Sequence, residues 1–154
     1  MPDFAGAKAA MRARLTDNWH AAPIVFGNRA KPLGWTAPWP PADADGILQP
    51  WVQLEIINTS AVVVAGGTPG NRVWNYDGDI LAHVFVPAGS GEDIATQYAV
   101  AIGEIFRAAE FYNAVDGFCV RTLAPFVDGG GSGDDDGSWF RVSMSVGYTY
   151  WHRG

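Results

Sequence analysis

The stretch that decides the fold of this chain runs from Gly78 to Ala109, with the sequence GDILAHVFVPAGSGEDIATQYAVAIGEIFRAA. It begins as a strand with apolar residues on both faces, and the strand ends at Pro87 because proline has no backbone N–H to donate. A Gly-Ser-Gly turn then leads into an amphipathic helix, which Ser90 is predicted to cap. The segment places no reactive side chain where chemistry needs one, which favours a protein that works by shape and assembly. The predicted apolar face of the helix consists of Ile94, Tyr98, Ala101, Ile102 and Ile105.

A long hairpin is predicted immediately upstream of this helix. Trp51–Thr59 alternates between apolar and polar side chains, which is typical of a strand with one buried face, and Ala61–Ala65 is apolar and β-branched. Gly66–Asn71 has the composition of a turn, and Arg72–Val86 that of the returning strand. We expect the tip of this hairpin to extend beyond the body of the domain.

A second amphipathic helix is predicted at the N-terminus. Pro23 is expected to end it, and Ile24–Phe26 to form a short strand. Ala30–Pro50 is too rich in proline for a helix or a central strand, so it is predicted to be an irregular loop. The apolar face of the N-terminal helix consists of Phe4, Ala7, Met11, Leu15 and Trp19.

The C-terminal region predicts a second hairpin. Phe118–Phe126 reads as one strand and Trp139–Trp151, which alternates strictly, as the other, with the acidic, glycine-rich loop Asp128–Ser138 between them. The chain is therefore expected to be a single α+β domain over residues 1–154, a mostly antiparallel sheet built from two long hairpins with two helices packed on one face.

Composition narrows the range of functions. The chain has 154 residues, a net charge of −6, only 17% charged residues and seven tryptophans, which suggests a surface that a partner covers. No basic stretch tracks a phosphate backbone, so sequence-specific reading of nucleic acid is not expected. No segment is long and apolar enough for a membrane span, and the N-terminus has no signal-peptide pattern. Cys119 is the single cysteine, so a disulfide framework is excluded and synthesis in a reducing cytoplasm is expected. We expect Cys119 itself to be a buried apolar residue.

Five motifs have a familiar order and spacing. The N-terminal helix ends in Asn18-Trp19 and is followed by Pro23 to Asn28, then by Pro50-Trp51-Val52, by Gly78 to Pro87, and by the closing strand Trp139 to Val146. Together these motifs resemble the phage tail terminator-like family, the minor tail proteins that cap a long non-contractile tail. The similarity covers nearly the whole chain.

The resemblance implies a structural virion protein without enzyme activity, catalytic residues, metal or cofactor. It implies a homo-hexameric ring on the last ring of the tail tube, which stops polymerisation and joins the tail to the neck. Its partners are then the major tail-tube protein and the neck or stopper protein, and DNA passes through the lumen without specific binding. Assembly would take place in the host bacterial cytoplasm.

Three groups of residues are candidates for contacts in such an assembly. The hairpin tip is a candidate subunit interface, the tryptophans are candidate interface aromatics, and the acidic loop is a candidate lumen or solvent surface that repels DNA, together with Asp77 and Asp79. The tip comprises Gly66, Gly67, Thr68, Pro69, Gly70, Asn71 and Arg72; the aromatics are Trp35, Trp39 and Trp74; the acidic residues are Asp128, Asp134, Asp135 and Asp136.

Other interpretations of the same residues stay open at this point. The acidic loop has the composition of a calcium loop but lacks the order of ligands in an EF-hand. The tryptophans also suit packing within the domain, or the stacking of sugars in a carbohydrate-binding module. A head-completion or neck protein of similar fold is a further alternative within the structural class. The histidines His20, His83 and His152 show no metal-binding spacing.

Overall fold

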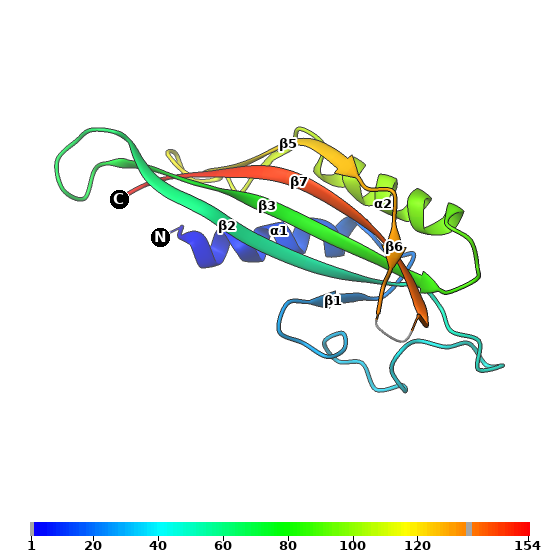
Figure 1. Ribbon diagram of the computed structural model, residues 1–154. Coiled ribbons are helices and arrows are strands. Elements are labelled where there is room, and N and C mark those ends of the chain that lie inside the picture. The colour runs from blue at the N-terminus through cyan, green and yellow to red at the C-terminus, as the bar shows by residue number, and fades with distance from the viewer. Residues whose placement is uncertain (1, 135–136) are drawn as a thin grey trace.

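The computed structural model describes residues 2–134 and 137–154. Two long helices and seven strands follow one another along the chain (Figure 1). Their order is α1 (Phe4–Asn18), β1 (Ile24–Phe26), β2 (Trp51–Ala65), β3 (Val73–Pro87), α2 (Asp93–Phe106), β4 (Glu110–Phe111), β5 (Cys119–Val127), β6 (Gly131–Ser132) and β7 (Trp139–Arg153).

The strands form one mostly antiparallel sheet, which confirms the predicted α+β fold with its two hairpins. The strand order is β1-β2-β3-β7-β5-β4, with β6 paired to β7. The β1–β2 pair is parallel, and β1 covers only the first part of β2, at Val52 to Leu54. The centre of the sheet is the continuous pairing of β3 with β7, from Val73↔Arg153 to Pro87↔Trp139.

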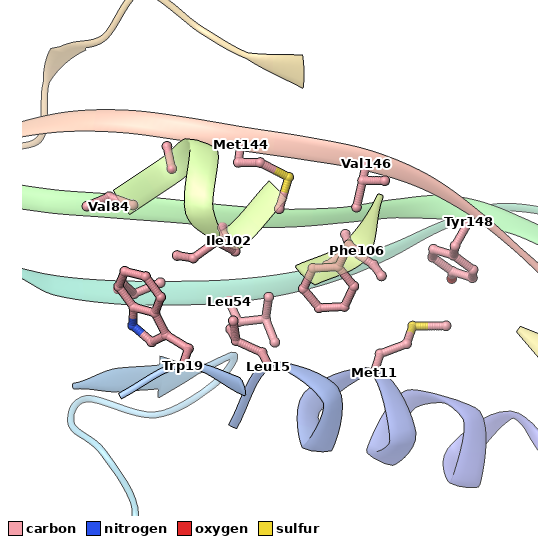
Figure 2. Packing of buried hydrophobic residues seen from close by; sticks show 14 of the residues in the cluster. Met11, Leu15, Trp19, Leu54, Val84, Ile102, Phe106, Met144, Val146 and Tyr148 are labelled. Atoms are coloured by element: carbon pink, nitrogen blue, oxygen red, sulfur yellow. The ribbon is translucent and has the colours of Figure 1, made fainter. Parts of the chain in front are cut away.

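Both helices pack on the same face of this sheet. Leu54, Ala82 and Met144 are partners across three neighbouring strands, so their side chains share one face, and all three belong to the buried cluster that includes residues of α1 and α2. Figure 2 shows Met11 and Leu15 of α1 beside residues of α2 and of the strands. The strict alternation predicted for the last strand therefore gives one core-facing row.

Helix α1 confirms the prediction from its apolar spacing. Asp3 caps it, since its carboxylate accepts a 2.7 Å hydrogen bond from the Gly6 N–H. Ala7, Met11 and Leu15 are fully buried. The helix ends at Asn18, so Pro23 lies beyond its last residue and does not itself end the helix as predicted.

The predicted cap of α2 is wrong. Glu92 occupies the N-cap position and makes no capping hydrogen bond from its side chain. The Ser90 hydroxyl instead donates a 2.6 Å hydrogen bond to the Pro87 carbonyl, which stabilises the turn before the helix.

The predicted apolar face of α2 is confirmed in part. Ile102 is buried, and Tyr98 and Ile105 pack against the core, whereas Ile94 is 50% exposed and Ala101 is exposed. Small residues of the helix also face the sheet, because they allow its backbone to approach closely. A Cβ atom built on Gly103 would lie 3.0 Å from Cβ of Pro125 in β5, so helix and sheet are in close contact at this glycine. The buried residues are Ala95, Ala99, Ile102, Gly103 and Phe106.

Cys119 is only partly buried, which corrects the prediction of a core cysteine. The alternation of β5 gives the buried positions to its neighbours Phe118 and Val120. Desolvation, followed by the nearby Glu110 carboxylate, raises the pKa of the Cys119 thiol, which lowers its reactivity at neutral pH.

Candidate assembly surfaces

The far half of the β2–β3 hairpin extends away from the core, as predicted, and we call it the arm (residues 57–72). Every residue of β2 from Ile57 to Ala65 is exposed, including Val62, Val63 and Val64 at 42–46%. In Figure 1 the loop that joins β2 to β3 lies at the end of the molecule opposite the β3–α2 connection. The arm therefore presents apolar side chains that the domain itself does not cover.

One edge of the arm has no strand beside it within the described ranges. β3 pairs with one side of β2 along its whole length, while β1 reaches only to Leu54 on the other side. Edge strands of soluble proteins usually carry a charge or a proline that blocks further pairing. The sequence from Ile56 to Asn71 contains a proline only at Pro69, in the tip, and no charged residue. Two β-bulges, at Thr59 and Val64, interrupt the regular register of β2 with β3.

The tip of the arm is an ordered turn tied to the C-terminal strand. The Asn71 N–H donates to the Thr68 carbonyl at 2.9 Å, and Arg72 and Gly154 exchange two backbone hydrogen bonds of 2.9 and 3.0 Å. A Cβ on Gly67 would lie 2.3 Å from the Asn71 carbonyl oxygen, so this position requires glycine. The structure thus brings the predicted tip residues Gly66 to Arg72 together in one turn.

Trp35 and Trp39 do not join Trp74. They lie in a chain of aromatic contacts that runs from the proline-rich loop to the sheet, with centroid distances of 5.4 Å for Trp35–Trp39 and 5.3 Å for Trp39–Trp51. Trp51 continues the chain by stacking on Phe85. Packing within the domain therefore accounts for these two candidate interface aromatics.

Trp74 lies at the opposite end of the sheet, close to the tip of the arm, where it pairs with Val63. Its indole N–H donates a 3.2 Å hydrogen bond to the Gly154 carbonyl, and its ring stacks on His152. His152 also stacks on Tyr150. Desolvation lowers the pKa of His152 and raises that of Tyr150.

The described carboxylates of the acidic loop bind backbone N–H groups. Asp128 accepts 3.0 Å hydrogen bonds from the N–H groups of Gly130 and Ser143, and Asp134 accepts one of 3.3 Å from Trp139. Asp135 and Asp136 lie outside the described residues. Elsewhere in the described chain no group of three or more His, Cys, Asp or Glu side chains could hold a metal ion.

Asp77 and Asp79 lie where the arm joins the body. Asp77 accepts hydrogen bonds from the Ser60 hydroxyl at 3.2 Å and from the Asn75 amide at 2.8 Å. Their partners in β7, Thr149 and Gly147, flank Tyr148, whose hydroxyl donates to Asn58. Desolvation, and then these two charges, raise the pKa of Tyr148 to about 12.

A connected Glu–His–Ser set on the open face of the sheet is absent from the sequence interpretation. His83 Nε2 lies 2.9 Å from a Glu55 carboxylate oxygen, and His83 Nδ1 lies 2.7 Å from the Ser143 hydroxyl. The three residues come from β2, β3 and β7. Only the strand register could have revealed them, since His83 and Ser143 are direct partners across the sheet.

The surroundings of Ser143 favour a structural role for this set. Its backbone N–H is already bonded to Asp128, so it is not free to stabilise an oxyanion, and its carbonyl accepts from the Asp128 N–H. The residue lies in the middle of a strand rather than at a sharp turn or strand end. Its hydrogen bonds therefore join three strands and the acidic loop.

Comparisons with known proteins show the fold alone. No family model matches the chain, and no curated protein matches it. One solved structure, of a protein whose name states no function, superposes with a TM-score of 0.63 over 97% of this chain and 96% of its own, at 19% sequence identity. In the part of the chain that the structure describes, neither helix is both long and apolar enough to cross a membrane.

Proposed function

We propose that this protein is a structural component of a phage virion, a tail terminator that forms a ring on the tail tube. The ring would stop tube polymerisation and join the tail to the neck of the head. The order and spacing of the sequence motifs support this function, and so does the α+β fold with its long hairpin. The observation that carries the proposal is the arm, an extension that carries no charge from Ile57 to Asn71 and has an unpaired β2 edge.

The proposed mechanism is geometric. A subunit that covers the free edge of its neighbour removes the unpaired N–H and C=O groups that would otherwise accept further strands. If one ring face resembles the next tube subunit and the other does not, addition of tube protein ends there. The proposed partners are further copies of this chain, the major tail-tube protein and the neck protein.

Two observations make the alternatives from other classes less favoured. Trp35 and Trp39 pack edge-on against each other, at an interplanar angle of 86°, and Trp39 packs on Trp51, so the two rings take part in packing within the domain and do not form one coplanar platform for sugars. The fully bonded backbone of Ser143 does not suit a nucleophile with its own oxyanion donor. We therefore propose that the protein acts without catalysis, cofactor or metal.

The role of the arm is tested by its assembly state in solution. Val63→Lys places a charge on the free edge, and we expect it to reduce association about tenfold or more, measured by light scattering after size exclusion. Val100→Lys is the matched control, because Val100 is a valine of similar exposure, 47% against 44%, on the outer face of α2. Equal assembly of both variants would remove the arm from the interface.

The biological role is tested by electron microscopy of particles that lack this gene. Overlong tails without heads are the result expected for a terminator. Tails of normal length that fail to join heads would place the protein in the neck instead. Intact, infectious particles would overturn the virion assignment and make glycan binding the next measurement.

A further inference from the structure

One face of this acidic protein is basic. Lys8 and Arg12, both half-buried, lie one turn apart on the flank of α1 beside β2, and Arg29 follows β1 close by. We call these three residues the basic face. The ion pairs among the described residues involve other side chains, namely Glu55–His83, Glu104–Arg107 and Glu110–Arg121.

Arg12 separates two hollows on this face. One, of about 660 Å³, is lined by Phe26, Arg29 and Leu33. The other, of about 540 Å³, is lined by Lys8 and by residues of β2 that include Glu55, whose carboxylate is paired with His83. The Arg12 guanidinium lies 5.9 Å from the centre of the Phe26 ring, which limits its motion before any partner binds. Leu33, 74% exposed, adds an apolar side chain beside the charges. This combination suits an acidic partner surface with an apolar depression.

Such a surface exists on the same chain. Glu92 and Asp93 are exposed where α2 begins, and we call them the acidic end. Glu92 also lines a groove of about 630 Å³ whose wall includes the rings of Trp139 and Phe140. The acidic end and the basic face thus each combine charge with apolar area, with opposite sign.

We propose that the basic face of one copy docks on the acidic end of the next, with Leu33 entering the groove beside Trp139. A basic face does not pair with itself, because like charges would meet across a two-fold axis. The contact is therefore head-to-tail, the kind of interface that generates rings when its rotation closes. The inference rests on the self-assembly part of the proposed function and names the surfaces involved.

The experiment is a reciprocal charge reversal, followed by light scattering and sedimentation velocity. Lys8→Glu/Arg12→Glu and Glu92→Lys/Asp93→Lys are each expected to weaken association about tenfold or more. An equimolar mixture of the two variants is expected to regain assembly, because each reversed surface then meets its complement. Arg107→Glu/Arg121→Glu carries the same change of charge as the basic-face variant, at two exposed positions away from the arm and from both docking surfaces, and is expected to assemble as the unmodified chain does. Circular dichroism confirms that each variant is folded.

The inference is overturned if both variants assemble as well as the original chain does, or if their mixture fails to assemble. It is also overturned if the original chain stays monomeric at millimolar concentration. Retention of duplex DNA by the unmodified protein, lost in Lys8→Glu/Arg12→Glu while assembly persists, would also overturn it and assign the basic face to a polyanion. If rings depend on this contact but particles that lack the gene have tails of normal length, the inference stands and only the tail-capping function is refuted.

Discussion

Trp51 and Phe85 stack face to face across β2 and β3, with ring centroids 4.2 Å apart and an interplanar angle of 11°. Trp51 also contacts Trp39 and Trp139, at 5.3 and 6.0 Å. It therefore connects the proline-rich loop, the first hairpin and the last strand at one point.

Removing this ring should destabilise the domain. We expect Trp51→Ala to lower the free energy of unfolding by about 3 kcal/mol, because it deletes three ring contacts and leaves a cavity. Trp35→Ala, at the outer end of the same aromatic chain, is expected to cost about 1 kcal/mol. Urea unfolding measures both. Equal losses of unfolding free energy in the two variants would contradict a central role for Trp51 in holding the loop to the sheet.

Gly78 marks the junction between the arm and the body. A Cβ at this position would lie 2.0 Å from the Ile57 carbonyl oxygen, a backbone atom that cannot move aside alone. Gly78→Ala should therefore lower stability by about 1–3 kcal/mol and shift the arm. Gly66→Ala is the matched control, since nothing lies within 4 Å of its Cβ. Thermal unfolding that is the same for both variants would contradict the close contact.

The pH dependence of stability should report on His152. Burial lowers the pKa of His152 from 6.5, so the unfolded chain binds the proton at a higher pH than the folded chain does. The free energy of unfolding is thus unaffected by this group above its unfolded pKa and decreases as the pH falls below it. We expect His152→Gln to flatten the loss of stability between about pH 7 and about pH 5, measured by urea titrations. The exposed His20→Gln is the control, and an equal flattening in both variants would exclude His152 as the cause.

The Glu55–His83–Ser143 set is expected to be structural. His83→Ala should lower the free energy of unfolding by about 1 kcal/mol, because two side-chain hydrogen bonds are lost. A fluorophosphonate probe should not label Ser143 in the protein without substitutions. Mass spectrometry checks this, and labelling of Ser143 that disappears in His83→Ala would establish a nucleophile. Ser145→Ala, on the same face of β7, is the control for stability.

The turn at the tip should matter for assembly rather than for folding. Replacing Gly66–Asn71 with Asn-Gly keeps a short hairpin connection and leaves the Arg72–Gly154 pairing in place. We expect a folded protomer with a melting temperature near that of the unmodified chain but without assembly. Rings of normal size from this variant would show that the tip makes no essential contact.

Local pattern alone determined much of this protein. The alternation of Trp139–Trp151, the apolar stripe of Phe4 to Trp19 and the turn Gly66–Asn71 predicted β7, α1 and the arm correctly. For β7 and α1 one period of side chains requires burial, and a single element satisfies it. The arm follows instead from the turn residues that separate its two strands. The α+β class followed from the order of these elements.

The features that depend on contacts between elements were decided only by the tertiary structure. The exact face of α2 followed its close approach to Pro125, so Gly103 is buried although Ile94 stays exposed. The link between Glu55, His83 and Ser143 needed the register of three strands. Likewise, only folding brings Arg29 beside Lys8 and Arg12, because residues distant in sequence carry no local signal of their contact.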